Sequence, residues 1–195
     1  MKQRYYLLKT AILIKLETEL PKRYYYHSFS HTIDMHDSAA NIVDFENINE
    51  ADKEMVLVAA LFHDAGFIID RENHEMHSCT IAKEMLPQFE YSPSEIEVIC
   101  SLIMATQMPV QPKNKLEEII CDADLDYLGR DDFKTIGDLL FRELSESGGV
   151  KGVEEWNQLQ IRFLNNHRYY SNYSQMHRES VKQENLKKLM DRKGE

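Results

Sequence analysis

A histidine and an aspartate, His63 and Asp64, stand side by side at the end of a strongly apolar segment, residues 53–63. Moving ionisable side chains out of water there is costly unless something compensates them. A divalent metal ion compensates both, because imidazole nitrogen and carboxylate oxygen bind first-row metals. The pair therefore predicts a metal site at a helix end, where relaxed geometry lets two neighbouring side chains meet one ion. The plainer alternative is a cationic histidine at a helix C-terminus with a capping neighbour.

Further side chains of the same types lie far away in the sequence. His31 precedes the pair, and Asp122 and Asp124 follow it, so the separations run to tens of residues. In a helical bundle, facing helices project inward ligands onto a shared point, which closes such separations. An apolar stretch, residues 116–120, precedes the two aspartates, so at least one carboxylate is expected to face inward. The residues alone leave Asp122 and Asp124 as alternatives.

Four segments, in this order, resemble the successive motifs of the HD superfamily of metal-dependent phosphohydrolases. The segments are YHSFSHT (26–32), LFHDAGF (61–67), NHEMHS (73–78) and CDADLDYLGR (121–130). A His-Asp dipeptide occurs often by chance, but four motifs in register form a specific pattern. The resemblance covers roughly residues 24–145.

This resemblance implies one divalent metal ion with four protein ligands. The implied ligands are His31, His63, Asp64 and Asp124. Asp124 is favoured over Asp122 because the last ligand of the family usually follows a small residue. The resemblance also implies hydrolysis of a small phosphate ester, with a nucleotide as one candidate. Mn, Mg, Fe, Co, Ni and Zn all suit such a ligand set, so the metal stays open.

Catalytic roles are expected for Asp64 and for two residues on the following helix. Asp64 is expected to bind the ion with one oxygen and to accept a hydrogen bond from the attacking water with the other. His74 is a candidate proton donor, since imidazole titrates near neutral pH, and Glu75 lies beside it. Surface pairing is the alternative role for both. Thr106 stands where relatives with two metals, among them di-iron oxygenases, place a histidine, so a single ion is expected.

Two arginines, Arg71 and Arg130, are the candidates to bind the substrate phosphate, because they lie close to the motifs in the sequence. A guanidinium group binds phosphate through two parallel hydrogen bonds. Charged side chains are more often simply solvated, which is the alternative here. His27, four residues before His31, is expected to pack beside the ligands or to support them.

The composition limits the function classes. The chain has 195 residues, of which 43% are apolar and 29% charged, as is typical of globular proteins. A net charge of -10 disfavours long nucleic acids as partners. A small phosphorylated substrate stays compatible, because a bound metal reverses the potential within one pocket. No membrane span or signal peptide is expected, and three cysteines without a CxxC pair indicate a cytoplasmic protein; a homo-oligomer is compatible with the sequence.

Turn-forming residues are scarce, with 7 glycines and 5 prolines, which favours long helices over many strands. Apolar spacing and caps at Ser30, Asn49 to Asp52 and Ser92 divide the chain into about nine helices. These are expected near residues 4–20, 31–45, 53–63, 74–86, 93–108, 116–125, 131–146, 151–167 and 173–191. We therefore predict an all-α, single-domain bundle over residues 1–195. Its motif-bearing core is expected near 24–145, with C-terminal helices 150–192 packed on it.

A non-catalytic regulatory or ligand-sensing module that retains the metal cage is the alternative to an enzyme. Residues 66–69, directly after the His-Asp pair, are non-ionisable, whereas related enzymes carry a glutamate near this place. The substrate itself is not defined by the motifs, because specificity depends on the shape and contacts of the pocket.

Overall fold

The computed structural model describes residues 3–191, and within this range the chain forms α-helices and short 3₁₀ turns but no strand. The all-α class predicted from the sequence is confirmed. The helices are α1 (Gln3–Glu19), α2 (Phe29–Phe45), α3 (Glu50–Phe62), α4 (His74–Met85), α5 (Pro93–Ala105), α6 (Lys115–Asp124), α7 (Phe133–Glu146), α8 (Val153–Asn166), α9 (Asn172–His177) and α10 (Glu179–Asp191). The 3₁₀ turns are η1 (Ala65–Ile68), η2 (Leu86–Phe89) and η3 (Asp126–Gly129). Residues 1, 2 and 192–195, at the ends of the predicted 1–195 domain, lie outside the described residues.

The described range contains ten α-helices where about nine were predicted, and the difference lies near the C-terminus. The single helix expected over residues 173–191 is broken at Arg178 into α9 and α10. Two contacts with η3 accompany the break. The Nε atom of Arg178 lies 2.7 Å from Asp126, and a Cβ atom on Gly129 would lie 2.3 Å from the Arg178 carbonyl oxygen. Tertiary contact therefore overrides a continuous helical pattern.

Helix starts follow the predicted caps in α3 and α5 but not in α2. The Asn49 side chain accepts hydrogen bonds from two backbone N–H groups of the first turn of α3. Ser92 and Glu95 form a reciprocal capping box at the start of α5. α2 starts two residues earlier than predicted, because Ser28 and not Ser30 is its N-cap, and the Ser28 side chain makes no capping bond.

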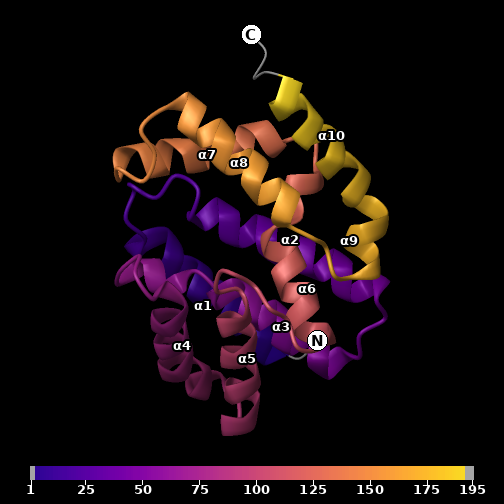
Figure 1. Ribbon diagram of the computed structural model, residues 1–195. Coiled ribbons are helices and arrows are strands. Elements are labelled where there is room, and N and C mark those ends of the chain that lie inside the picture. Colours follow the sequence, from indigo (N-terminus) through magenta and orange to yellow (C-terminus); the bar gives the residue numbers. More distant parts are fainter. Residues whose placement is uncertain (1–2, 192–195) are drawn as a thin grey trace.

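Helix α3 is the central buried helix, as the sequence predicts. Residues 55–62 are each at most 6% exposed. Helices α1, α2, α5 and α6 all pack against α3 (Figure 1), which explains why residues 55–62 are apolar on every side of the helix. The residues that follow α3 therefore enter the interior of the molecule. No helix in residues 3–191 combines the length and apolar character needed to cross a membrane.

Helices α1 to α6 form a first layer, and helices α7, α8 and α10 form a second layer on the other side of α2 from α4 and α5 (Figure 1). This layer has its own apolar core, whose most buried members are Leu128 and Leu164, with Tyr169 and Leu189 beside them. Helix α10 packs on both α8 and η3. Helix α10 thus contacts the motif-bearing part of the chain at η3.

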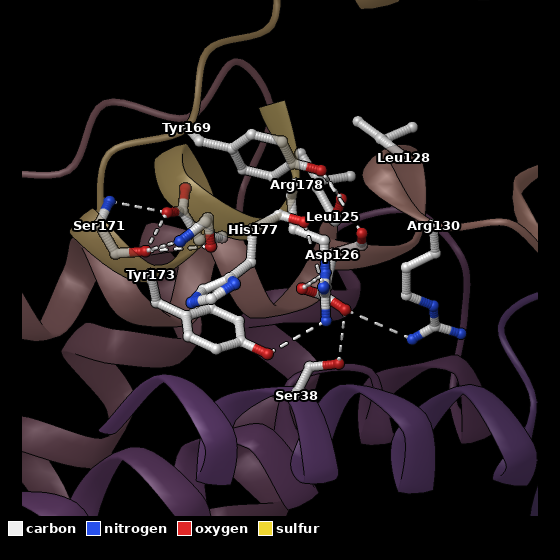
Figure 2. Close-up of polar contacts among 12 residues, drawn as sticks. Ser38, Leu125, Asp126, Leu128, Arg130, Tyr169, Ser171, Tyr173, His177 and Arg178 are labelled. Carbon is white, nitrogen blue, oxygen red and sulfur yellow. Dashed lines mark hydrogen bonds and ion pairs between the residues drawn. The ribbon is translucent and has the colours of Figure 1, made fainter. Parts of the chain in front are cut away.

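Asp126 connects the two layers through a buried ionic network (Figure 2). Its carboxylate accepts a hydrogen bond from Arg178 Nε at 2.7 Å and one from the Ser38 hydroxyl at 3.2 Å. Arg130 approaches the same carboxylate at 3.5 Å. The Tyr169 hydroxyl donates to the carbonyl oxygen of Leu125, 3.1 Å away. These contacts hold η3, and the end of α6 before it, in a fixed position.

Candidate metal centre

The His-Asp pair lies in a tight turn that α4 holds in place. Helix α3 ends at Phe62, so His63 and Asp64 occupy the turn before η1, and both are buried. The Ser78 hydroxyl donates to the His63 carbonyl oxygen at 2.7 Å and accepts the Gly66 N–H at 2.8 Å. Gly66 is required here because a Cβ atom would lie 1.9 Å from the carbonyl oxygen of His74. The close approach of α4 therefore fixes the conformation of the turn.

Four side chains from three separate parts of the chain converge at this turn. His31 comes from the first turn of α2, and Asp124 is the last residue of α6. The Nε2 atoms of His31 and His63 lie 3.2 Å apart, and Asp124 Oδ1 lies 3.2 Å from His31 Nε2. Asp64 Oδ2 lies 3.3 Å from His63 Nε2 and 3.6 Å from His31 Nε2. His31, His63 and Asp124 thus offer ligand atoms that all lie within 4.8 Å of one another, and Asp64 Oδ2 lies against the two imidazoles of this group.

The His63 ring directs its Nε2 atom toward this cluster. Its Nδ1 atom lies 2.9 Å from the carbonyl oxygen of Ala60, one turn earlier in the chain. A carbonyl oxygen only accepts hydrogen bonds, so Nδ1 carries a hydrogen, and in the neutral ring Nε2 presents its lone pair. Hydrogen bonding of the second ring nitrogen to a carbonyl is the arrangement that orients metal-binding histidines.

The cluster is buried and contains the carboxylates of Asp64 and Asp124, and these properties suit a bound cation. Asp64 Oδ2 is buried and has no hydrogen-bond partner. Burial alone would lower the pKa of the His63 imidazole, but the carboxylates of Asp64 and Asp124 reverse this and raise the pKa to about 9. Burial raises the pKa of Asp64, yet the imidazoles of His63, His27 and His31 hold it below its usual range. Two imidazole nitrogens and two carboxylates form a donor set that suits a first-row divalent ion.

Asp122 faces a different part of the molecule from Asp124. Its carboxylate accepts hydrogen bonds from the backbone N–H groups of Tyr170 and Ser171 at 2.8–3.1 Å, and from the Ser171 hydroxyl at 2.7 Å. Burial raises the pKa of Asp122 to about 6, against the effect of these hydrogen bonds. Asp124, and not Asp122, therefore lies beside the two imidazoles.

His74 and Glu75, the two other expected catalytic residues, border the cluster from the start of α4. His74 Nε2 lies 3.5 Å from Asp64 Oδ1 and 3.4 Å from Glu75 Oε1. Its Nδ1 atom lies 3.1 Å from the carbonyl oxygen of Arg71. The His74 ring packs on Phe67 with a centroid distance of 4.4 Å. The arrangement places a proton-carrying ring between two carboxylates.

The structure does not bring either expected substrate-binding arginine to this place. Arg130 donates hydrogen bonds to Asp34 and to Asp132, at 2.7–3.0 Å. Arg71 donates to the Ser147 hydroxyl at 3.1 Å. Neither arginine lines the cavity next to the cluster. Nearness to the motifs in the sequence was a poor guide, because a guanidinium group goes to whichever carboxylates the fold places around it.

Glu143, which the sequence did not single out, helps to position the site together with the rings of Phe67 and Tyr26. Glu143, on α7, accepts hydrogen bonds from the backbone N–H groups of Tyr26 and His27 at 3.0 and 3.2 Å, and from the His27 ring at 2.6 Å. Phe67 stacks against the His27 ring at a centroid distance of 4.3 Å. The Tyr26 ring packs on His31 at 4.6 Å. Glu143 is more than a hundred residues from its partners, and the sequence holds no local signal that would connect them.

A cavity of about 460 Å³ opens beside the cluster. Its ionisable lining on the side of the cluster includes Asp64, Asp124, His27, His74 and Glu75, and Gln160 of α8 adds a polar group on the other side. Thr106, which was expected to stand in the place of a second-metal histidine, also lines it. The opposite lining comes from α7 and α8. A volume of this size accommodates a small molecule.

The chain belongs to the HD domain family, whose model matches residues 28–126. This range contains all four clustered side chains. It does not contain α7 and α8.

Two further proteins are similar to this chain. An uncharacterized protein from Clostridium beijerinckii is 32% identical over 87 residues, a match that covers 42% of this chain and 53% of that protein. The match therefore spans about half the length of that relative. The crystal structure of a predicted HD superfamily hydrolase from an uncultured Thermotogales bacterium has a TM-score of 0.54 and 20% identity. It covers 67% of this chain and 72% of its own, and at this identity the likeness concerns the fold.

Proposed function

We propose that the protein is a metal-dependent phosphohydrolase that cleaves a small phosphate ester. One observation carries this proposal: the buried Asp64 Oδ2 has no hydrogen-bond partner, yet it lies beside two imidazole nitrogens at the edge of a cavity. A single divalent ion, Mn, Mg, Fe, Co, Ni or Zn, satisfies that oxygen. The residues that would hold it are His31, His63, Asp64 and Asp124.

The bound ion would lower the pKa of water and offset negative charge that develops on the phosphoryl group. The chain supplies the proton transfers. Asp64 has its second oxygen, Oδ1, on the side of His74, and this oxygen is placed to accept a hydrogen bond from the attacking water. Geometry of this kind is the first requirement for general base catalysis.

His74 is the proposed proton donor to the leaving group. Because its Nδ1 atom donates to the Arg71 carbonyl oxygen, the Nε2 atom is the one that faces Asp64 and Glu75. A proton on Nε2 would face the Glu75 carboxylate, 3.4 Å away, until the leaving oxygen takes it. Glu75 is buried, so it holds a fixed position beside the ring.

We assign the protein to the cytoplasm, because Cys79, Cys100 and Cys121 are all free and buried. Reduced cysteines of this kind suit a compartment rich in thiol reductants. The substrate is proposed to be a small phosphorylated molecule and not a long nucleic acid, in accord with the net charge of -10.

The test combines metal analysis with activity. The purified full-length chain is measured for bound metal and then assayed with p-nitrophenyl phosphate and bis-p-nitrophenyl phosphate, each with Mn, Mg, Co, Ni, Fe and Zn. We expect about one metal ion per chain and turnover with at least one metal. The Asp64→Asn protein should lose the bound metal and the turnover. The Asp138→Asn protein, whose substitution lies in an exposed pair with Lys134, should keep the metal and the turnover.

Two results separate the enzyme from a regulatory module. His74→Gln should keep the metal but lower kcat by about a hundredfold, in the range of a lost general acid. A chain that binds metal yet hydrolyses neither ester with any metal would support the regulatory module instead. A metal-free wild-type chain would overturn the site as well as the activity.

A further inference from the structure

The cavity next to the candidate metal centre has two walls of different chemistry. The first layer supplies a wall that contains three carboxylates, those of Asp64, Glu75 and Asp124. Helices α7 and α8 supply an apolar wall, formed mainly by Phe133, Leu140, Leu144, Trp156, Phe163 and Leu164. Both helices lie outside the residues that match the family model. The apolar wall is therefore a feature of this chain beyond the family core.

The apolar wall has accessible surface that the protein itself does not cover. Leu140, Leu144 and Phe163 are only partly buried, and all three line the cavity. Leu140 and Phe163 also pack on the buried core of the second layer, which keeps the wall in place. Water against a concave apolar wall is displaced favourably by an apolar ligand. The wall is thus suited to a hydrophobic group.

Cationic side chains are missing from the lining. Among residues 3–191, no lysine or arginine lines this cavity. Proteins usually hold diphosphates and triphosphates with several such cations in addition to a metal. A lining without such cations suits one phosphoryl group at the metal centre better than a chain of two or three.

We propose that the substrate is a phosphate monoester of a hydrophobic alcohol, a proposal that rests on the phosphohydrolase function above. The phosphoryl group lies at the metal centre, and the aliphatic or aromatic part of the alcohol packs on the wall formed by α7 and α8. Hydrolysis forms a bond between the water oxygen and phosphorus and breaks the bond between phosphorus and the alcohol oxygen. That oxygen takes a proton, and inorganic phosphate and the free alcohol are released.

The first test is a series of n-alkyl phosphates, from ethyl to octyl phosphate, with AMP and ATP in parallel, on the metal-loaded full-length protein. Each added methylene should raise kcat/KM by about fourfold while the apolar wall is being filled. Octyl phosphate should be a better substrate than AMP and ATP. A flat series, or a preference for either nucleotide, would overturn the proposal.

Two neighbouring leucines of α7 provide a matched pair of variants. Leu140 lines the cavity, whereas Leu139 does not line it and is 42% exposed. Leu140→Gln should lower the ratio of kcat/KM for octyl over ethyl phosphate by about tenfold. Leu139→Gln should keep the wild-type ratio. An unchanged ratio in Leu140→Gln would contradict the assigned position of the hydrophobic group.

A binding measurement separates this proposal from the proposed activity. Octyl phosphonate and ethyl phosphonate are not hydrolysed, and their affinities for the metal-loaded protein are compared by calorimetry. Tighter binding of octyl phosphonate without turnover of any phosphate would refute the activity and retain the ligand class. Equal affinities would refute the ligand class even if turnover is found.

Discussion

Asp122 and Asp124 are two residues apart at the end of α6, yet their carboxylates serve different parts of the molecule. Asp124 Oδ1 lies 3.2 Å from His31 Nε2, whereas Asp122 accepts hydrogen bonds from the backbone of Tyr170 and Ser171. Helical geometry turns side chains two positions apart toward nearly opposite faces. One face of α6 therefore points to the candidate metal centre and the other to the segment before α9.

This arrangement predicts that the same substitution at Asp124 and at Asp122 changes different properties of the protein. Asp124→Asn replaces a proposed ligand and should lower bound metal to a small fraction of the wild-type value, because a neutral amide is a poor substitute for a carboxylate ligand. Asp122→Asn should keep the metal but lower the free energy of unfolding by about 1–3 kcal/mol, since buried hydrogen-bond donors lose a charged acceptor. Metal content by mass spectrometry and urea unfolding measure the two effects. Metal loss in a folded Asp122→Asn protein would reverse the assignment.

A second prediction concerns the hydroxyl that fixes the turn of His63. Ser78 is fully buried and bridges the His63 carbonyl oxygen and the Gly66 N–H. Ser78→Ala leaves both groups without this partner and should lower the free energy of unfolding by about 1–3 kcal/mol. Thr80→Ala is the control on the same helix, because Thr80 is exposed and bonds only back along α4 to Met76. Thr80→Ala should lower the free energy of unfolding by less than about 0.7 kcal/mol. Equal losses in the Ser78→Ala and Thr80→Ala proteins would refute the bridging role of Ser78.

Two glycines should respond oppositely to alanine. A Cβ atom on Gly66 would lie 1.9 Å from the backbone oxygen of His74, so Gly66→Ala forces α4 away and should cost about 3 kcal/mol or more. A Cβ atom on Gly137, within α7, would lie 3.2 Å from the end of the Gln160 side chain and 3.9 Å, an ordinary contact distance, from the Trp156 ring. Gly137→Ala should therefore stabilise the protein by about 0.5–1 kcal/mol, the helical preference of alanine over glycine. The denaturant midpoints of unfolding measure the stability change in each variant. A Gly66→Ala protein as stable as the wild type would contradict the close approach of α4.

The elements of the fold were predictable where local chemistry decides them. The capping box of Ser92 and Glu95 and the Asn49 cap are encoded within a few residues, and both start helices as predicted. The apolar run before His63 likewise identified the central buried helix. The break at Arg178 was not predictable, because its cause is an ion pair with Asp126, fifty-two residues away in the chain. Local patterns do not contain information about such partners.

The same distinction applies to the candidate site. The types and order of four residues were enough to propose that they meet, and three of them, His31, His63 and Asp124, lie close to one another with Asp64 against the imidazoles. The support from Ser78 and Glu143 was not visible, because each acts through backbone groups of distant segments. Arg130 was assigned to the substrate from its place in the sequence, but Asp34, ninety-six residues away, holds it. Which charges pair across a bundle depends on the packing of helices.

The last prediction concerns the dependence of stability on pH. Burial, with help from the nearby charge of Lys182, lowers the pKa of His167 from 6.5 to about 4 in the folded protein, although Glu179 opposes this. The unfolded chain binds a proton at His167 below about pH 6.5 while the folded protein does not, so acid favours unfolding. The stability that the neutral His167 ring contributes to the folded protein is fully present above pH 6.5 and is lost as the pH falls through 4.

The change over this window should reach up to about 3 kcal/mol, at 1.36 kcal/mol for each unit of pKa shift. His167→Phe keeps a ring against Phe163 and Tyr169 but cannot take up a proton. Urea unfolding of both proteins at several pH values from about 8 to about 4 gives the comparison. The difference between them should be constant above about pH 7 and should shift in favour of the variant below it. A difference that stays constant down to pH 4 would mean that His167 is protonated equally easily in the folded and unfolded states.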